Sequence, residues 1–485
     1  MGAKDPGVIC TSYRPDRGKR IKSLVMGAHL LQMGPASQGE TDQFRDSCLP
    51  TEVEPHVGRI QRIFKGLGLV VGGKAGAGLI SLIYLVLATR FLGPTEYGVL
   101  VLVHAYVTTV CGIVEFPSWQ AIVRYGAEAD REGDNHRLGR LLRFGAGVEL
   151  AGGALAIVSA MALAQFVGPH LGWPPKAMAF AQVYSFAVLG SVRSTPSGYL
   201  QLIGRFDLIG LHNLVQPIVR LGGALIVIAF GWGIKSFLVV WLLAALAEFA
   251  VLWAMGFWFA ARRLGASLWN PQAGDVALEN PGIWRFLIAS NADVTLSELA
   301  GRIAPLIVGW IMGPASAGLF AVAQRATVII AQPAQILGNT SYAELAHIVA
   351  GGGGGKPLRQ TLAKVVGISL LAALPVVVIV AAFPAAIVGL LAGPAFAAAS
   401  TLMVVLVAAR GIALVGPPCT SAISALGHPA RSMSANLFSS LVFLPVLPWL
   451  LHRYGLMGAG IQAVGQALLA SSLLVFFVWH SSRKL

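Results

Sequence analysis

Ten charged side chains lie inside long apolar segments of this 485-residue chain. Six are basic and four are acidic: Lys74, Arg193, Arg220, Arg302, Arg325 and Arg410, then Glu115, Glu248, Asp293 and Glu298. A charge in such a segment is costly unless it faces water, a partner or a substrate. Arginine offers phosphate oxygens a planar fork of donors and lysine a point charge, whereas a carboxylate can carry a proton or a sodium ion. These residue types therefore indicate anion binding, with ion coupling as a second possibility.

The same charges could instead hold helices together. Glu298 and Arg302 are four residues apart, in the order that favours a pair within one helix. Arg193 lies near a segment end and could extend toward lipid phosphates, and Glu115 could contact Arg124. Three others could pair within one half of the chain: Arg220, Glu248 and Arg410. The sequence leaves both interpretations open for these residues.

The composition is that of a polytopic membrane protein. Hydrophobic residues make up 56% of the chain, charged residues only 12%, and the mean hydropathy is +0.72, whereas soluble domains are about 25% charged. The net charge is +14, but the basic residues are scattered among apolar segments, which argues against a nucleic-acid partner. The four cysteines are scattered too, so the sequence predicts no metal site and no cofactor.

Spacing of the apolar segments predicts about twelve spanning helices, since ~20 helical residues cross the ~30 Å hydrocarbon core. They are residues 66–90, 97–117, 145–167, 177–200, 211–231, 236–259, 286–312, 316–347, 365–391, 396–425, 433–452 and 457–480. Residues 1–62 are polar and are predicted to be a disordered basic cytoplasmic extension, with Met26 and Met33 as alternative starts. A charged loop is expected over 124–143, and a longer polar loop over 262–284 divides lobes of residues 63–264 and 265–485.

The loop charges predict the orientation of these helices. Fifteen cations fall on one side: Arg124, Arg131, Arg137, Arg140, Arg143, Arg205, Arg262, Arg263, Arg285, Lys356, Arg359, Lys364, Arg431, Arg483 and Lys484. Four fall on the other: Arg90, Lys176, Lys235 and Arg453. The richer side is expected to be cytoplasmic, which places both termini in the cytoplasm.

The two lobes show an internal repeat. The turn LGPTEYG at 92–98 is echoed by MGPASAG at 312–318, 220 positions later from Gly93 to Gly313. LIGR at 202–205 is echoed by ALGH at 425–428, 223 positions later from Gly204 to Gly427. Six helices per half make the repeats parallel, related by an axis normal to the membrane, which is an organisation typical of transporters.

Four motifs then resemble a known family. LGPTEYG, RYGAEAD at 124–130, GRFD at 204–207 and MGPASAGLF at 312–320 are similar to those of the Wzx-like oligosaccharide flippases. These belong to the multidrug/oligosaccharidyl-lipid/polysaccharide exporter superfamily. The resemblance covers about residues 63–480, and the N-terminal extension departs from it. It implies an all-α protein with two six-helix lobes forming a V around a central cavity that opens to each membrane face in turn.

The resemblance also implies the cargo, an undecaprenyl-pyrophosphate-linked oligosaccharide carried from the cytoplasmic to the periplasmic leaflet. That places the chain in the inner membrane, in O-antigen or exopolysaccharide biosynthesis, as a transporter rather than an enzyme. Its expected partners are this lipid-linked substrate, membrane lipids and the polysaccharide polymerase machinery. The alternative is a cation-coupled exporter of drugs or small solutes from the same superfamily. A membrane glycosyltransferase or polymerase is disfavoured because the predicted outer loops are short.

In that family the opening hairpins of the lobes line the cavity, which selects the candidate site residues. Lys74, Arg302 and Arg325 are the foremost candidates for the diphosphate, with Arg220 and Arg410 as further substrate-binding candidates. Asp293 and Glu298 are the candidates for ion coupling. Moved by 220 positions, Lys74 falls on Val294 and Arg302 on Leu82. Because these charges do not recur in the other half, a role in substrate or ion contact is favoured over packing.

Overall fold

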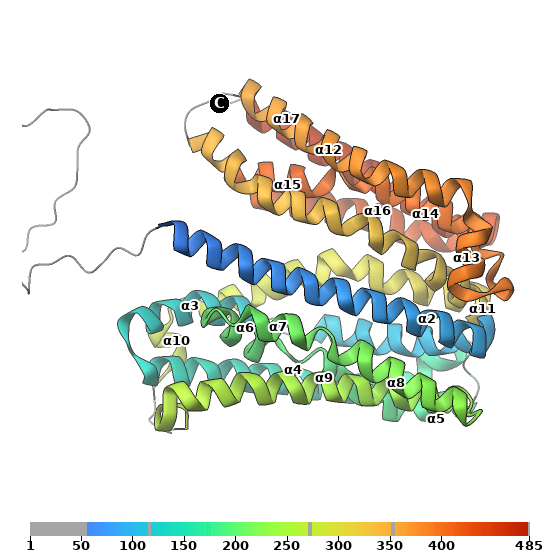
Figure 1. Ribbon diagram of the computed structural model, residues 1–485, viewed down its shortest axis with the longest axis horizontal. Helices are drawn as coiled ribbons and strands as arrows, with labels where there is room; N and C mark the ends of the chain where they lie inside the picture. The colour runs from blue at the N-terminus through green and yellow to red at the C-terminus, as the bar shows by residue number, and fades with distance from the viewer. Residues whose placement is uncertain are drawn as a thin grey trace, which may run out of the picture. The chain divides into compact units, whose positions relative to one another are not determined.

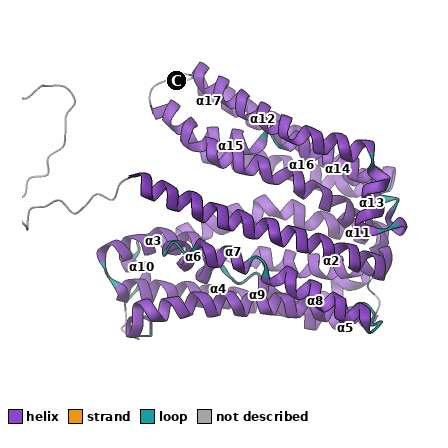
Figure 2. Ribbon diagram, viewed as in Figure 1, coloured by secondary structure: helices purple, strands orange, loops and turns teal. Residues whose placement is uncertain are grey.

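The described part of the chain consists of helices joined by short turns, with no strand among its residues (Figure 2). The computed structural model describes residues 56–114, 118–171, 173, 175–269, 274–350 and 355–483. Most of the predicted N-terminal extension and Glu115 lie outside these ranges. Figure 1 shows the helices of each half as a bundle of roughly parallel rods.

The first half begins with α2 (His56–Val114), a single helical run that contains both helices of the opening hairpin. It continues with α3 (Trp119–Glu132), α4 (Asn135–His170), α5 (Pro175–Tyr184), η1 (Ser185–Gly190), α6 (Ser194–Leu202), α7 (Phe206–His212), α8 (Val215–Ala229) and α9 (Ile234–Leu264). The connection to the second half contains η2 (Gly265–Leu268) and α10 (Val276–Glu279).

The second half begins with α11 (Ile283–Ala350), which contains the second hairpin. It continues with α12 (Gly355–Ala382), α13 (Pro384–Ala392), η3 (Pro394–Phe396), α14 (Ala399–Ala413), α15 (Gly416–Ala425), α16 (Pro429–Tyr454) and α17 (Met457–Ser482).

Nine helices of the described residues are long and apolar enough to cross a membrane. Two of these candidates, Gly72–Ile113 and Gly301–Arg325, each include parts of two predicted helices, because the helical run continues through the hairpin turn. The predicted fourth helix is not among the nine, because it is divided into α5, η1 and α6. With these three differences the nine candidates correspond to the twelve predicted segments, and the predicted polytopic all-α class is confirmed.

Three pairs of glycines carry the repeat in their backbone. Gly93 has φ 69° and ψ 178°, and Gly313, its predicted equivalent, has φ 81° and ψ 172°. This region of backbone space is essentially restricted to glycine. Gly204 and Gly427 follow with φ of 72° and 78°. A third pair that the sequence reading did not use, Gly231 and Gly455, has φ of 67° and 59°. The predicted repeat is therefore present at the level of local geometry.

The two hairpins cross each other through a reciprocal contact. A Cβ added to Gly98 would lie 1.7 Å from the Pro314 carbonyl oxygen, and one added to Gly318 would lie 2.4 Å from the Pro94 carbonyl oxygen. Both distances are far inside van der Waals contact, so only glycine permits the backbones to approach this closely. Since each contact is the other moved by 220 positions, a pseudo-twofold axis passes between the hairpins.

Near this crossing the halves share one apolar core, which includes Leu100 and Val107 of α2, Val308 of α11 and Leu402 of α14. Beside it, Arg90 of α2 donates to the Leu390 carbonyl oxygen of α13 at 3.2 Å. Toward the predicted cytoplasmic end the apolar cores are smaller. One lies within the second half around Leu345 and Ile423, and another within the first half around Ile122, Leu138 and Leu264. A smaller cluster there joins the halves, since Tyr125 and Leu141 of the first half pack with Ile283 and Leu287 at the start of α11. The halves thus share a large core at the predicted extracytoplasmic end and a small one at the other end, where each half also has a core of its own.

The charged stretch 124–143 is helical, so the predicted loop there is wrong. It forms most of α3 and the first turns of α4, with Gly133 in the left-handed region ending α3. Asp134 begins α4, because its carboxylate accepts a 2.8 Å hydrogen bond from the Arg137 backbone amide. The sequence reading underestimated how far α4 extends beyond its apolar segment, since charged residues are good helix formers outside the hydrocarbon core.

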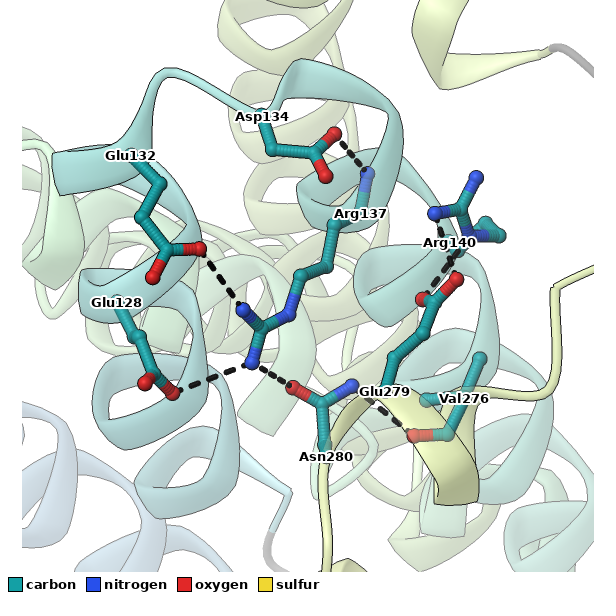
Figure 3. A network of polar contacts seen from close by, with 8 residues as sticks. All are labelled: Glu128, Glu132, Asp134, Arg137, Arg140, Val276, Glu279 and Asn280. Carbon is teal, nitrogen blue, oxygen red and sulfur yellow. Dashed lines mark hydrogen bonds and ion pairs between the residues drawn. The ribbon is translucent and has the colours of Figure 1, made fainter. Parts of the chain in front are cut away.

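The polar connection between the halves is bound to these helices (Figure 3). Arg137 of α4 pairs with Glu128 and Glu132 of α3 and donates to the Asn280 side-chain oxygen at 3.2 Å. Arg140 pairs with Glu279 of α10 at 2.6 Å. These contacts hold the residues that directly precede α11, and so they fix where the second half begins against the first.

Candidate functional site

The site is built around a break in the predicted fourth helix. The helix ends with η1 at Gly190 and restarts with α6 at Ser194. A helix start leaves backbone N–H groups without intrahelical partners, and apolar surroundings offer no water to satisfy them. The buried carboxylate of Glu149 on α4 accepts from the backbone amides of Ser194 and Thr195, the latter at 2.7 Å. Glu149 therefore stabilises the break from a neighbouring helix.

The break positions Arg193 against α9. Its guanidinium forms an ion pair with Glu248, whose side chain is 9% exposed, whereas that of Arg193 is 49% exposed. His212, at the end of α7, bonds the Glu248 backbone oxygen through Nε2 at 3.0 Å. Because a carbonyl oxygen only accepts, Nε2 must carry the proton, which leaves Nδ1 to accept or to bind a second proton. Arg193 is thus held at one end and open to solvent at the other.

Arg302 approaches the same region from α11. Its Nη1 donates to the Thr108 carbonyl oxygen of α2 at 2.8 Å. A Cβ at Gly112 would lie 2.1 Å from that nitrogen, so glycine is needed for the guanidinium to pass. Thr295 of α11 donates to the Gly112 carbonyl oxygen at 2.8 Å. Together these contacts hold the first hairpin helix of the second half against the first half.

A cavity of about 350 Å³ lies among these residues, within the range of roughly 300–1,000 Å³ that is typical of small-ligand sites. Its described lining is Gly112, Trp119, Ser191, Arg193, Ser194, Ser197, Gln201, Ile209, His212, Asn213, Leu252, Thr295 and Arg302. Two guanidiniums, one from each half, belong to this lining, and no carboxylate is found among these thirteen residues. The cavity is therefore suited chemically to an anion that needs several hydrogen-bond donors.

The predicted site residues do not all lie in one place. Arg302 lies in the cavity wall, and its contact with substrate stays a prediction. Lys74 is exposed on α2 outside that wall, one residue after Gly73, which packs against the Gly210 backbone of α7. The side chains of Asp293 and Glu298 lie outside the described part of the structure. Ion coupling by these two carboxylates stays a prediction.

Arg220 and Arg325 lie near each other in a second cationic region. Both interact electrostatically with Tyr97 and His104 of α2. The Arg220 guanidinium carbon lies 4.1 Å from the centre of the Trp241 ring, a cation–π distance. Its Nε and Nη2 are buried without a hydrogen-bond partner in the described part of the chain. Arg220 therefore keeps hydrogen-bond donors that are not used within the described residues, and no ion pair with a carboxylate is found for it there.

Arg410 is set apart from both cationic regions. It lies near the end of α14 in the second half and is exposed, outside the cavity lining. The structure therefore brings Arg193 and Arg302 together in one place and Arg220 and Arg325 in another. Arg410 and Lys74 stand outside both groups, and their substrate contact stays a prediction.

The sequence reading missed two residues of the site. Glu149 was absent from its set of intramembrane charges, although it lies within a predicted span. His212 was not considered, because a lone histidine near a turn carries little signal. The available clue was Ser194-Thr195-Pro196, a helix-start pattern inside an apolar segment. A restart there requires a partner for its free amides, and Glu149 is the nearest acidic residue that precedes it in the sequence.

Comparisons with known proteins fit this architecture. The model of a family described as "Polysaccharide biosynthesis protein" matches residues 86–401. The inner membrane protein YghQ of Escherichia coli K12 is 26% identical over 295 residues, which cover 60% of this chain and 82% of that protein.

Solved structures with the same fold are transporters. One is an inward-facing multidrug resistance MATE family transporter of the MOP superfamily, with a TM-score of 0.66 and 14% identity over 84% of this chain and 94% of that one. Another is a MOP superfamily transporter from Pyrococcus furiosus described as having a binding pocket of reverse polarity. Its TM-score is 0.59, with 15% identity over 87% of this chain and 95% of that one. The chain therefore belongs to the polysaccharide biosynthesis protein family, which agrees with the resemblance of its motifs to the Wzx-like flippases.

Proposed function

We propose that this protein carries an undecaprenyl-pyrophosphate-linked oligosaccharide from the cytoplasmic to the periplasmic leaflet of the inner membrane. The observation that supports this proposal best is the cavity lined by Arg193 and Arg302, which has guanidiniums from both halves and no carboxylate in its described lining. A diphosphate leaves water only if other donors replace its hydration shell, and guanidiniums do so with paired N–H groups. Ser194, Ser197 and Gln201 supply neutral partners for the first sugar.

The separate cores at the predicted cytoplasmic end support the direction of loading. Each half has an apolar core of its own there, and the cluster that joins the halves around Tyr125 and Ile283 is small, whereas the halves share a large core at the opposite end. The cavity lies toward the end with separate cores, so we infer that the diphosphate enters from the cytoplasmic leaflet. Arg220 and Arg325, closer to the shared core, then form the next cationic position along the path. Lys74, exposed on α2, meets the headgroup outside the loading cavity.

The proposal can be tested by binding and by export. Arg193→Ala and Arg302→Ala should each weaken binding of undecaprenyl diphosphate to the purified protein by roughly tenfold or more, since each removes a charge-assisted contact. Arg193→Ala should have the larger effect, because it also leaves Glu248 as an unpaired negative charge. Arg302→Ala and Lys74→Ala should abolish export of surface polysaccharide at unchanged protein level.

The matched control is Arg285→Ala, which removes an exposed arginine from the same helix as Arg302 but outside the cavity. It should leave binding and export as in the parent protein. Arg193→Lys adds a test of geometry, since it keeps the charge and loses the planar fork. Equal binding by the parent, Arg193→Ala and Arg302→Ala would exclude the cavity as the diphosphate site.

The alternative is a cation-coupled exporter of drugs or small solutes, which the fold of the MATE family neighbours would also serve. A cationic substrate would need carboxylates in the site, whereas the described lining has two guanidiniums. The alternative predicts that the parent protein lowers accumulation of an organic cation such as ethidium in cells. It also predicts that Arg302→Ala would improve that extrusion rather than weaken it.

A further inference from the structure

The last part of the chain is entirely free of acidic residues. After Glu344 the sequence contains no aspartate or glutamate, while it contains Lys356, Arg359, Lys364, Arg410, Arg431, Arg453, Arg483 and Lys484. Carboxylates therefore cannot neutralise these cations from within that segment. Four of them lie at or near helix ends on the predicted cytoplasmic side, namely Lys356, Arg359, Arg431 and Arg483, and Lys364 lies further along α12.

Three of these arginines converge on the end of α17. Arg359 donates to the Ser482 hydroxyl at 2.8 Å, and Arg431 donates to the Ser481 hydroxyl at 2.6 Å. The guanidinium carbon of Arg483 lies 3.5 Å from the centre of the Trp479 ring. All of these partners are neutral, and among the described residues no carboxylate pairs with the three guanidiniums. We refer to Arg359, Arg431 and Arg483 as the terminal arginine cluster.

An apolar groove begins at the same tryptophan. Its volume is about 450 Å³, and it is lined by Val415, just before α15, and on α17 by Ser471, Ser472, Val475, Phe476 and Trp479. Val475, Phe476 and Trp479 are between 43% and 53% exposed. The groove follows α17 away from the terminal arginine cluster, from Trp479 toward Ser471. A molecule with an anionic head and an apolar chain would match this arrangement from end to end.

We propose that the groove and the terminal arginine cluster form a binding site for an anionic phospholipid of the surrounding bilayer. The phosphate accepts from Arg483 and from the guanidinium N–H groups that Arg359 and Arg431 do not use within the protein. One acyl chain lies along Val475 and Phe476 in the groove, and the Trp479 ring occupies the interface between headgroup and chain. This site is separate from the cavity, and it does not depend on the cargo proposed above.

The favourable interaction of arginines with the carboxyl end of a helix does not account for all of these features. It explains why Arg359 and Arg431 approach the last residues of α17, where backbone carbonyl groups have no helical partner. It does not explain the exposed Arg483 on the face of Trp479, nor the exposed apolar groove beyond it. A lipid with a charged headgroup explains both.

The test measures lipid retained by the purified full-length protein, using native mass spectrometry after titration with dioleoyl phosphatidylglycerol or dioleoyl phosphatidylcholine. The parent protein should retain phosphatidylglycerol preferentially. Arg359→Gln combined with Arg483→Gln should weaken its binding by a factor of roughly 10–30, the loss expected for two cations near a phosphate. Arg453→Gln, at the other end of α16, is the matched control and should bind as the parent does.

Two further measurements make the result decisive. Arg483→Gln alone changes an exposed side chain and so leaves the fold intact, and it should weaken phosphatidylglycerol binding severalfold. Glycerol 3-phosphate, which has the headgroup chemistry without acyl chains, should fail to displace the lipid. Equal retention of phosphatidylglycerol by the parent and the double variant, or equal retention of phosphatidylcholine by the parent, would overturn the proposal. Arg302→Ala should not alter this binding, which separates the outcome from that of the flippase proposal.

Discussion

The two halves of this protein share a backbone plan and differ in their polar residues. Gly93, Gly204 and Gly231 have equivalents of similar φ at Gly313, Gly427 and Gly455. Asn213 likewise falls on Asn436, but four other polar groups of the first half have no such counterparts. Moved by 223 positions, Arg193, His212, Arg220 and Glu248 fall on Gly416, Ala435, Phe443 and Ser471. The two halves thus share the turns that shape the fold. The polar residues of the cavity come from the first half and from α11, which packs against it.

The break in the fourth helix shows how the same geometry is supported by different means. In the first half the restart at Ser194 exposes amides that Glu149 accepts. In the second half the equivalent break separates α14 from α15, and the restart is Gly416-Pro417-Pro418. Proline has no N–H and is well suited to the first turn of a helix. The second half therefore needs no buried carboxylate at its break, and none is found among the described residues there.

The largest loss of stability is expected at the reciprocal glycine contact between the two hairpins, which is nearly the same in both halves. Gly98→Ala would place Cβ against the Pro314 carbonyl oxygen, and Gly318→Ala would do the same at Pro94. Because backbone atoms cannot yield as a side chain can, we expect losses of about 3 and about 2 kcal/mol in stability, respectively. Thermal unfolding of the purified variants in detergent would measure them.

Gly78→Ala is the control for this pair, since Gly78 lies in the same helical run with no atom within 4 Å of an added Cβ. It should be neutral or stabilising by up to about 1 kcal/mol. If Gly98→Ala and Gly318→Ala melted at the same temperature as Gly78→Ala, the reciprocal crossing would not hold the halves together.

A smaller loss of stability is expected at the helix break before Ser194, which the two halves stabilise by different means. Glu149→Leu leaves the Ser194 and Thr195 amides without acceptors, which should cost about 2 kcal/mol. Pro417→Ala at the equivalent break removes no hydrogen bond and should change stability by less than about 1 kcal/mol. Unfolding measured for both variants, with Glu149→Gln as a variant that keeps one acceptor oxygen, tests the comparison. Equal losses at the two breaks would mean that Glu149 is not a cap.

The sequence predicted the shared plan well because that plan depends on local chemistry. The turn at Gly93 requires a glycine-only conformation followed by Pro94, and both residues are visible in the chain. Long apolar segments likewise predict spanning helices. The charged segment 124–143 was misjudged because outside the membrane a helix needs no apolar segment to mark it.

The site was predicted only in part, because its members meet through tertiary packing. Arg302 was selected from its hairpin and does line the cavity, but its neighbour Arg193 was treated as a residue of the membrane interface. Nothing within α6 or α9 indicates that Arg193 and Glu248, 55 positions apart, form an ion pair. The position of Arg193 follows from the helix break, and the break depends on Glu149 in another helix. The spacing of residues along the sequence cannot reveal an arrangement in which one side chain depends on a residue in another helix.

The smallest effect on stability is expected from a substitution that tests the difference in charge between the halves. Glu248→Gln removes the negative charge beside Arg193 and makes this position neutral, as it is at Ser471 in the second half. Stability should fall by about 1 kcal/mol, a figure that allows for the solvent exposure of Arg193. Binding of undecaprenyl diphosphate should nevertheless strengthen by roughly threefold at low salt, since the Arg193 charge is no longer neutralised, and the gain should shrink as salt screens it.

Asp207→Asn is the matched control for this prediction, because Asp207 also pairs with an arginine, Arg205, but outside the cavity. It should leave affinity unchanged at any salt concentration. A Glu248→Gln variant that bound the diphosphate more weakly would show that the carboxylate orients Arg193 for its ligand rather than competing with it. In that case the ion pair itself, and not the bare guanidinium, would be the functional unit that the second half lacks.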